Sequence, residues 1–556
     1  MAKKIKDISL QNLPACAADF IKLVVKKMRY RKKVQADVQA ELAAHFEDEL
    51  KDCKTGEEKE KRAEKLITEF GDAKLLAVLM RRAKKRCRPL WRTVVARTFQ
   101  TIGVLILCLI LYVVWFVTGK PVITTDYVAE LNRIACPADD ESLNAAPFYR
   151  KAVEMTKDIS EGGGIFYLLG SDYDEVNDVD KQLIRQWMAD NAEAFELIIA
   201  GSEKPYCWHE YKTGQGTTEM MGIHIPDISG IRKLAFALRW RVWLAVEDGR
   251  YKEAFNDLKS FYRFGMHLRG DKTLIEQLVG MAIEALAINT LCDVFSECEI
   301  DSTELAAFQK DFEQMISGED FVVSLKAEKL FIYDEIQRCF TEDRLGGGHL
   351  YFERLKRIWP MIYMYSAPLE LISRRDWTAP LHILFTHPNK QQTREMVDRL
   401  FNYCDNIACK SPAQIRNEGI DVEKEIMEMV KGNILLEMLI PSIDGVIESG
   451  HRRRISVEST LTIVAILRYK KDTGSYPDSL QELKAAGHLK ELPMDPYSDK
   501  PIIYKKTGEN FILYSIGRNF TDDGGQFFYD DRGRPFSLGT KEAGDWIFWP
   551  VPKREK

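Results

Sequence analysis

One stretch of the chain limits its possible folds more than any other. From Phe99 to Thr118 the sequence reads FQTIGVLILCLILYVVWFVT, without a single charged side chain. At about 1.5 Å of rise per residue, a helix of this length crosses a hydrocarbon core of about 30 Å. Tyr112 and Trp115 lie toward its end, where aromatic rings favour the headgroup level. A buried core helix of this length would normally carry a polar stripe, so we predict one transmembrane helix over residues 98–119.

Charged residues on either side of this stretch predict its orientation. After it, only Lys120 precedes the carboxylates Asp126 and Glu130. Because cationic side chains resist translocation, we expect a single-pass protein of the bacterial inner membrane, with its N-terminus in the cytoplasm and its C-terminal region periplasmic. The basic cluster can also contact anionic headgroups, which makes membrane lipid an expected partner. The basic residues just before the stretch are Arg81, Arg82, Lys84, Lys85, Arg86, Arg88, Arg92 and Arg97.

The overall charge conceals a division between the two sides. The chain has 556 residues, 45% hydrophobic and 29% charged, which excludes wholesale disorder and predicts several folded domains. Its formal net charge of -5 gives no reason to expect a nucleic-acid partner. Residues 1–97 hold 25 Lys and Arg against 14 Asp and Glu, whereas residues 98–556 hold 54 against 70. A basic cytosolic domain and an acidic outer region are therefore expected.

The first 97 residues are predicted to form a cytosolic helical domain with a basic juxtamembrane end. Apolar residues recur at helical spacing over Ala15–Met28, Lys32–Lys51 and Glu57–Phe70. A fourth helix is expected to begin near Leu75 and to continue into the basic cluster.

Part of this domain resembles a known family. The strings VQADVQAELAAHFEDEL and AEKLITEFGDAKLLAVLM are similar to the HAAS-type helical domain, which precedes membrane spans in many bacterial proteins. The resemblance implies a signalling or interaction domain with protein partners in the cytosol, and no enzymatic role. A lone His45 on a charged helix is typical of a surface or capping residue. The matching residues are Glu41, Leu42, His45, Glu47, Ala63, Phe70, Gly71, Asp72, Leu75 and Leu76.

Residues 120–450 are predicted to form a large extracytoplasmic α-helical domain. Apolar residues recur three and four positions apart, as packed antiparallel helices require. The most apolar later stretch, 274–295, is interrupted by Glu276, Glu284 and Asp293, so we expect a buried helix there. The predicted helices are Asn144–Lys157, Val179–Ile199, Gly230–Glu247, Tyr251–Leu268, Lys272–Glu297, Thr303–Met315, Phe321–Phe340 and Thr393–Ile407.

One motif in this region resembles a tetratricopeptide-type hairpin. In LAVEDGRYKEAF, Gly249 would permit the turn and Ala254 would let two helices approach closely. Since only one copy is visible and such arrays need several stacked units, an ordinary helical hairpin is the alternative.

The outer region also holds the residues that could act as acids and bases. These are His209, Glu210, His224, Asp227 and His267, four of which lie in the loop-like segment CWHEYKTGQGTTEMMGIHIPD. That segment contains no HExxH, GxSxG, P-loop or CxxC pattern. We therefore predict no catalytic, cofactor-binding or metal-binding residue, and keep an extracytoplasmic hydrolase as an alternative function.

Seven of the eleven cysteines fall outside the membrane in this scheme. An odd number leaves at least one thiol free or paired between chains. Buried free thiols are the favoured interpretation, and none of the spacings indicates zinc. The seven are Cys136, Cys207, Cys292, Cys298, Cys339, Cys404 and Cys409.

Residues 451–556 are predicted to form a small C-terminal α+β domain. A helix over Ile455–Lys470 is followed by two alternating runs, Ile502–Lys505 and Phe511–Ser515, joined by KTGEN. Such a pair predicts a β-hairpin with a glycine-containing loop.

This domain resembles the soluble head of type II secretion major pseudopilins. The matching motifs are RYKKDTGSYPDSLQEL, LPMDPY, YKKTGENFILYSIGRN, DDGG and GDW. In that family the late acidic loop can bind calcium, and the matching oxygens here would come from Asp522 and Asp523, with Asp530 as a further candidate. Because acidic turn clusters are usually just solvated, we predict no metal site there. Pseudopilins, however, carry an N-terminal hydrophobic helix with an early acidic residue. The apolar run here has none and follows a cytosolic domain, so assembly into a pilus is not expected.

Three functions follow from the predicted order of domains. The first is an anchored sensor, scaffold or binding protein with partners in the cytosol and the envelope. The alternatives are a secretion or envelope-assembly component that uses the pseudopilin-like head, and an extracytoplasmic hydrolase.

Overall fold

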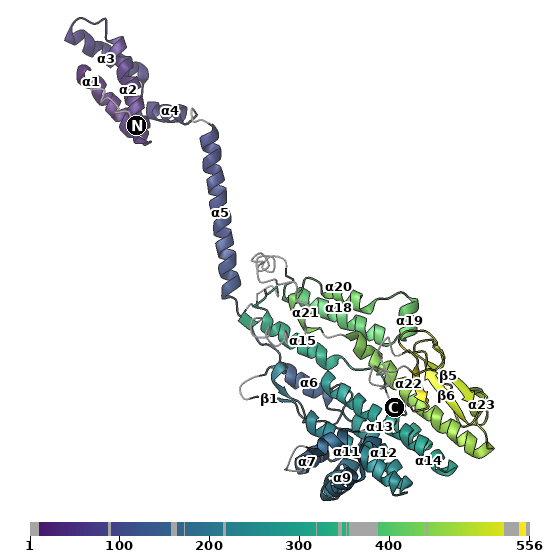
Figure 1. The fold of residues 1–556 in the computed structure, drawn as a ribbon. Coiled ribbons are helices and arrows are strands. Elements are labelled where there is room, and N and C mark those ends of the chain that lie inside the picture. The colour runs from purple at the N-terminus through teal and green to yellow at the C-terminus, as the bar shows by residue number, and fades with distance from the viewer. Residues whose placement is uncertain are drawn as a thin grey trace. The chain divides into compact units, whose positions relative to one another are not determined.

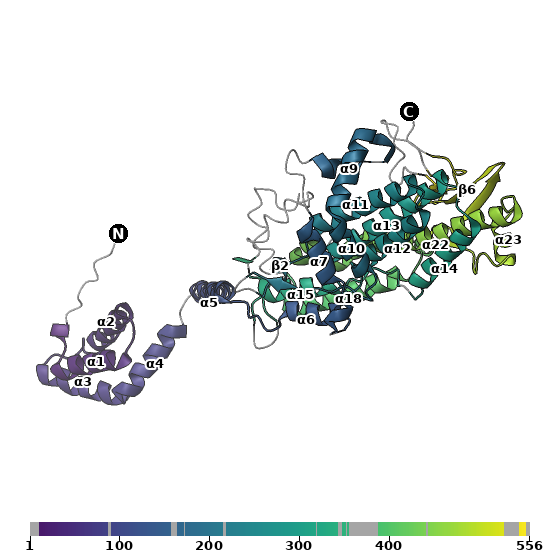
Figure 2. The same ribbon diagram turned by 90° about the horizontal axis from the view of Figure 1, so that it is seen from below.

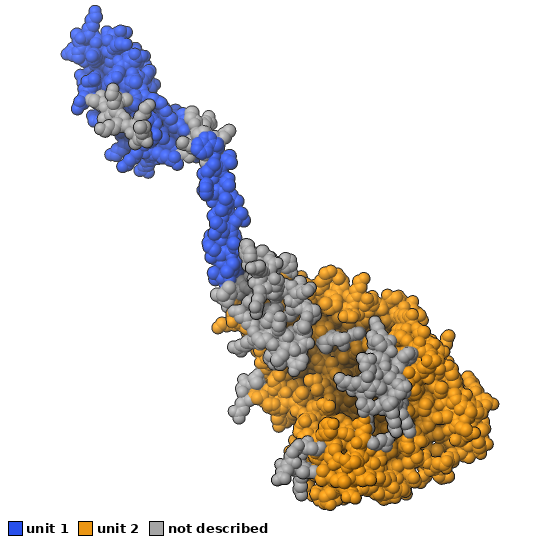
Figure 3. Space-filling model, in the orientation of Figure 1, with its two compact units in different colours: residues 1–118 blue, residues 119–556 orange. Residues whose placement is uncertain are grey.

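The computed structural model confirms a mostly helical fold. Most of its helices and some of its strands are labelled in Figures 1 and 2, and its two compact units, residues 1–118 and 119–556, are coloured separately in Figure 3. The structure describes residues 10–86, 90–138, 140–156, 164–171, 173–214, 218–318, 320–342, 347–351, 353–354, 387–440, 443–527 and 544–551.

The first unit contains a small helical core. Its first four helices are α1 (Ala15–Met28), α2 (Lys32–Glu49), α3 (Gly56–Phe70) and α4 (Ala73–Arg86). They follow the predicted ranges closely because apolar spacing and local caps agree. At the start of α3, for example, Thr55 and Glu58 form a capping box. The core includes Ile21, Val24, Val38, Leu42 and Phe46, all almost fully buried.

Two helices are long and apolar enough to cross a membrane. One is Val94–Trp115 within α5 (Leu90–Thr118), and the other is α13 (Leu274–Glu297). None of the apolar window of α5 is buried, whereas 56% of the window of α13 is. Length and composition select both helices; what distinguishes them is that protein covers much of α13.

The second unit is built mainly of packed helices (Figure 2). The predicted helix over 179–199 is in fact two helices, because Asn191 leaves the helical conformation and its side-chain amide donates to the Trp187 carbonyl at 2.8 Å. The remaining helices are α6 (Tyr127–Ala135), α7 (Ala146–Met155), α8 (Gly164–Gly170), α9 (Asp178–Asp190), α10 (Ala192–Ser202), α11 (Ile228–Glu247), α12 (Tyr251–Met266), α14 (Ser302–Met315), α15 (Lys326–Cys339), α18 (Lys390–Ala408), α19 (Pro412–Asn417), α20 (Val422–Val430) and α21 (Ile434–Leu439).

Two glycines allow α12 and α13 to cross at close range. A Cβ atom on Gly265 would lie 2.7 Å from the Gly280 carbonyl oxygen, and one on Gly280 would lie 2.6 Å from the Gly265 carbonyl oxygen. Neither position has room for a larger residue while the backbones stay where they are. This crossing places the first turns of α13 beside the loop that follows α12.

A buried carboxylate joins α13 to two other parts of the unit. Glu284 is fully buried and forms ion pairs with Arg269, just after α12, and with Arg453 on α22 (Ile443–Thr473). The Nε atom of Arg453 lies 2.9 Å from the Glu284 carboxylate. Because a buried charge without a counter-charge is strongly unfavourable, these three residues restrain one another.

The 31-residue helix α22 links two hydrophobic cores. Ile443, Val446 and Ile447 pack in a core with α15, α18 and α20, while the stretch from Ile455 to Ile466 packs with α11–α14 and the C-terminal sheet. The domain boundary predicted at residue 451 therefore lies inside a continuous helix.

A three-stranded antiparallel sheet packs against α22 in the order β5-β6-β7 (Figure 1). The predicted hairpin corresponds to β5 (Ile503–Thr507) and β6 (Asn510–Ser515), with Tyr504 opposite Leu513. The strand β7 (Trp546–Trp549) pairs with the other edge of β6. Three further elements lie outside this sheet. The helix α23 (Leu480–Ala485) follows α22, and the pairs β1 (Lys212–Thr213) with β2 (Ile223–His224) and β3 (Met494–Asp495) with β4 (Lys500–Pro501) are two residues long.

Asp495, from the LPMDPY motif, holds the C-terminal turns together. Its buried carboxylate accepts hydrogen bonds from the Ser515 hydroxyl at 2.7 Å, the Tyr497 amide at 3.0 Å and the Ile516 amide at 3.1 Å. A carboxylate that accepts several backbone donors is a strong local organiser. The motif that carried the resemblance thus has a structural role of its own.

The helix crossing gives a testable difference between two glycines. Gly280→Ala should destabilise residues 119–556 by about 1–3 kcal/mol, because a methyl group collides with the backbone of α12. Gly445→Ala, on α22, meets no atom within 4 Å and should be neutral or stabilising by up to about 1 kcal/mol. Urea unfolding of both variants measures the difference, and equal effects would contradict the close crossing.

Candidate functional site

The segment from Tyr206 to Tyr211 is held extended by two asparagines. Asn144 donates to the Trp208 carbonyl at 2.7 Å and accepts from the Trp208 amide at 2.9 Å. Asn132 does the same for Tyr211, at 2.9 and 2.7 Å. In an extended segment alternate side chains share a face. Accordingly Cys207 and Tyr211 are buried, with the partly buried His209 between them.

The predicted acids and bases do not converge. Glu210 is exposed and pairs with Lys212 at 2.8 Å, and His224 is exposed on β2. Asp227 caps α11, accepting from the Gly230 amide at 2.9 Å. Only His209 and His267 take part in buried polar clusters, and these clusters have different partners.

His209 faces a buried carboxylate at the start of α13. Its Nε2 atom lies 3.7 Å from Oε1 of Glu276, which is fully buried. The other carboxylate oxygen accepts from the Tyr211 hydroxyl at 2.7 Å and from the Thr273 hydroxyl at 2.6 Å. Burial lowers the pKa of His209, although Glu276 opposes this shift. A small shift of the His209 ring would bring Nε2 within hydrogen-bond distance of Oε1 of Glu276.

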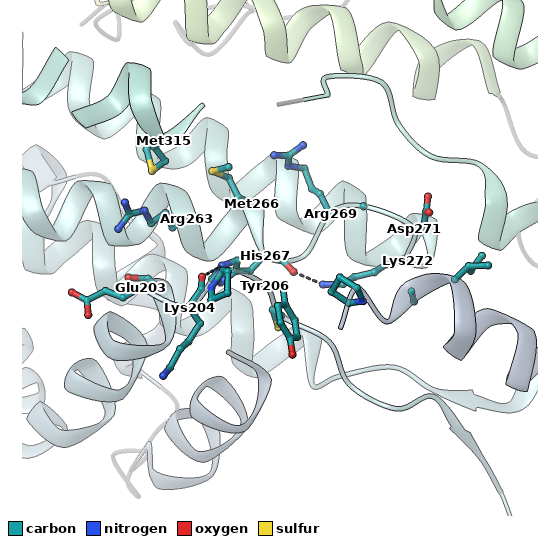
Figure 4. Close-up of a pocket in the computed structure, with 17 residues that line it drawn as sticks. Glu203, Lys204, Tyr206, Arg263, Met266, His267, Arg269, Asp271, Lys272 and Met315 are labelled. Carbon is teal, nitrogen blue, oxygen red and sulfur yellow. Dashed lines mark hydrogen bonds between the residues drawn. The ribbon is translucent and has the colours of Figure 1, made fainter. Parts of the chain in front are cut away.

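Beside this cluster lies a pocket of about 550 Å³. Figure 4 shows His267 at its centre, with the Lys272 ammonium donating to the backbone carbonyl of His267. The pocket is bordered by the segment after α10, the loop between α12 and α13, and the end of α14. Its charged lining residues are Lys204, Arg263, Arg269 and Lys272, together with Glu203 and Asp271.

His267 is held neutral by its two ring hydrogen bonds. Its Nε2 atom lies 2.9 Å from the Lys204 carbonyl, which can only accept, so Nε2 carries the proton. Its Nδ1 atom then accepts from the Tyr149 hydroxyl at 2.7 Å. Burial lowers the pKa of His267 to about 3. With both nitrogens engaged, this histidine orders the pocket wall and has no free lone pair for proton transfer.

The remaining polar lining favours binding of an anionic group. Arg269 and Asp271 already have partners, Glu284 and Lys326. Lys272 is 4% exposed, and His267 supplies the one acceptor that its ammonium has among the described residues. Lys204, Arg263 and Lys272 then face only one further lining carboxylate, Glu203, so the pocket has a net positive charge within a unit that is acidic as a whole. Nearby thiol chemistry is disfavoured, since burial raises the pKa of Cys207.

Sequence reasoning missed several residues of this region. Lys272, Asn132 and Asn144 have no distinguishing local pattern, because their partners lie far along the chain. Glu276 did have a signal, as a carboxylate that interrupts an apolar run. The role of Glu276 could not be predicted, because its partners His209 and Tyr211 are more than 60 positions away.

The carboxylates in and near the acidic loop of the C-terminal domain accept hydrogen bonds from other groups of the chain. Asp522 accepts from the Tyr514 hydroxyl at 2.8 Å, and Asp523 accepts from the Asn519 amide at 2.7 Å. Asp545 accepts from the Gly525 amide at 2.7 Å. Asp530 lies outside the described residues. Within the described part of the chain, no group of three or more His, Cys, Asp or Glu residues is arranged to hold a metal ion.

The ten described cysteines are free thiols. Of those that follow α5 in the chain, Cys207, Cys292, Cys339 and Cys404 are buried. Their burial fits the interpretation of small apolar core residues.

The neutral state of His267 predicts a pH dependence. The folded pKa lies below the ordinary value of about 6.5, so the unfolded chain binds more protons and stability falls as pH drops below 6.5. Between pH 7.5 and 4.5, protonation of His267 in the unfolded chain should lower the free energy of unfolding by about 2–3 kcal/mol. In His267→Gln the decrease in unfolding free energy over that pH range should be smaller by the same amount, about 2–3 kcal/mol. Urea unfolding of residues 119–556 measures it. His224→Gln, at an exposed position, is the control, and parallel pH profiles for all three proteins would refute the neutral assignment.

Comparison of the chain with models of protein families, with curated proteins and with solved structures finds no match. The HAAS-type and pseudopilin-type resemblances therefore stay predictions.

Proposed function

We propose that this chain is a single-pass, membrane-anchored binding protein that connects an outer ligand-binding unit to a cytosolic interaction domain. The observation that carries the proposal is the contrast between α5 and α13. The apolar window of α5 has no protein covering, and about 30 Å of hydrocarbon would cover a helix of that length. In α13 the buried Glu276 and Glu284 have protein partners, which fits a core helix.

The first unit supports an interaction role. It has its own hydrophobic core and is strongly basic, and it precedes the uncovered helix in the chain. Its HAAS-type resemblance implies the same role. Under this proposal the N-terminal side stays in the cytoplasm, since eight cationic residues lie close before the apolar run.

The outer unit supports binding more than catalysis. His267 has both ring nitrogens engaged, whereas Glu210 and Asp227 have local partners. His224 is exposed, and His209 faces Glu276 in a different cluster. The pocket instead offers Lys204, Arg263 and Lys272, against the single further carboxylate of Glu203, to a small ligand with an anionic group. The hydrolase alternative has no comparable constellation among the described residues.

The secretion-component alternative is also less well supported. The helix of the pseudopilin-like head packs along α13 and α14 and forms a second core with α18 and α20. A head embedded in this way serves as a part of the outer unit.

Topology can be tested with truncation fusions. Alkaline phosphatase fused after residue 272 and after residue 301, on either side of α13, should be active in both cases. Green fluorescent protein fused at the N-terminus should fluoresce. Activity after residue 272 that disappears after residue 301 would show that α13 also crosses the membrane. A phosphatase that is inactive at both positions would contradict the proposed orientation.

Binding can be tested with simple anions. At constant ionic strength, sulfate or phosphate should raise the unfolding temperature of residues 119–556 above its value in chloride, because a ligand that binds only the folded state stabilises it. Arg263→Gln should remove most of this difference, whereas Lys424→Gln, an exposed lysine on α20, should retain it. The same response in both variants would rule out the pocket as the anion site.

A further inference from the structure

One face of α4 exposes three large apolar side chains. Leu75 is 60% exposed, Val78 41% and Leu79 52%. They follow one another at helical spacing, so they form one stripe, while Ala73 and Ala77 on the other side pack into the core. The described residues of the first unit leave this stripe uncovered.

The stripe continues into free cationic side chains. Arg82 and Lys85 are exposed; Arg82 lies three positions beyond Leu79 and Lys85 seven beyond Val78, so both continue the face. Within the described chain no carboxylate pairs with either of them. By contrast, Lys84 pairs with Glu41 and Arg81 lies over the Tyr30 ring at 6.0 Å.

The surrounding sequence has a single sign of charge. Between Ala73 and Thr125 there is no Asp or Glu. Arg86 and Leu90, the first residue of α5, are four peptide steps apart, which reach at most about 14 Å. If α5 enters a membrane at residue 98, about 12 Å of helix separates Leu90 from the hydrocarbon edge, so the end of α4 lies within about 26 Å of that edge.

We propose that α4 is an interfacial helix that docks the cytosolic unit on the anionic leaflet that α5 enters. Leu75, Val78 and Leu79 insert at the boundary between headgroups and acyl chains, and Arg82 and Lys85 bind lipid phosphates. The inference rests on the proposed span. It adds that the exposed face of α4 binds the anionic leaflet, which the span alone does not require.

The charge pattern favours a lipid surface over a second copy of the chain. A parallel two-fold contact through this stripe would bring Arg82 and Lys85 of two copies close together, and like charges repel. In an antiparallel contact these cations would meet no carboxylate of the facing helix, because residues 73–86 contain none. An anionic bilayer satisfies the apolar and the cationic parts of the face together.

The test uses the full chain in lipid nanodiscs and hydrogen exchange followed by mass spectrometry. In discs that contain about one third phosphatidylglycerol, amides of 73–86 should exchange about threefold or more slowly than in phosphatidylcholine discs. Raising the salt from about 50 mM to about 500 mM should weaken this protection, because screening shortens the range of the attraction.

Matched variants separate the two parts of the face. The double variant Leu75→Gln and Leu79→Gln should lose the protection, whereas Leu23→Gln, at a leucine on α1 that is 44% exposed, should keep it. The double variant Arg82→Gln and Lys85→Gln should lose the dependence on lipid charge. Lys59→Gln and Lys65→Gln, at exposed positions on α3, should not.

The outcomes separate this inference from the proposed span. A chain that does not enter discs contradicts the span itself. A chain that enters discs but exchanges equally in both lipids overturns the interfacial helix and leaves the span intact. Protection that persists in neutral detergent and rises with protein concentration would assign the face to a second copy and also overturn the inference.

Discussion

The unit of residues 119–556 depends on one buried charge. Glu284 lies in the middle of the long apolar helix α13 and is tolerated there because Arg269 and Arg453 neutralise it. Arg269 borders the pocket, and Arg453 belongs to the helix that carries the C-terminal sheet. The requirement to pair one carboxylate therefore fixes the loop after α12, the register of α13 and the rotation of α22 together, and the close glycine crossing brings these groups within reach.

Local features of the fold could be predicted from the sequence, and long-range ones could not. The range Ala15–Met28 matches α1, and the β5–β6 hairpin matches its predicted runs, because spacing, caps and turn residues act within a few positions. The break at Asn191 was missed, since it depends on a side-chain amide that joins the Asn191 backbone N–H on the Trp187 carbonyl. The strand β7 was missed because its partner lies more than 30 positions earlier.

The same limit applies to the candidate site and to the span. His267 was named from the sequence, but its neutral state depends on Tyr149, 118 positions away. His209 was named as well, and its partner Glu276 was seen as an interruption of an apolar run. Composition selects α5 and α13 alike as membrane-length helices. The two helices differ in how much of each is buried, and burial depends on residues far away in the sequence.

The continuity of α22 has a mechanical consequence. A helix of 31 residues is about 46 Å long and, without an internal break, behaves as a stiff lever. One end sits under the β-sheet and the other, at Ile443, is anchored in a different core. A tilt of about 5° at the sheet end would displace Ile443 by about 4 Å, which is close to the width of a methyl group. Strain applied to the C-terminal sheet would therefore arrive, amplified, at α18 and α20.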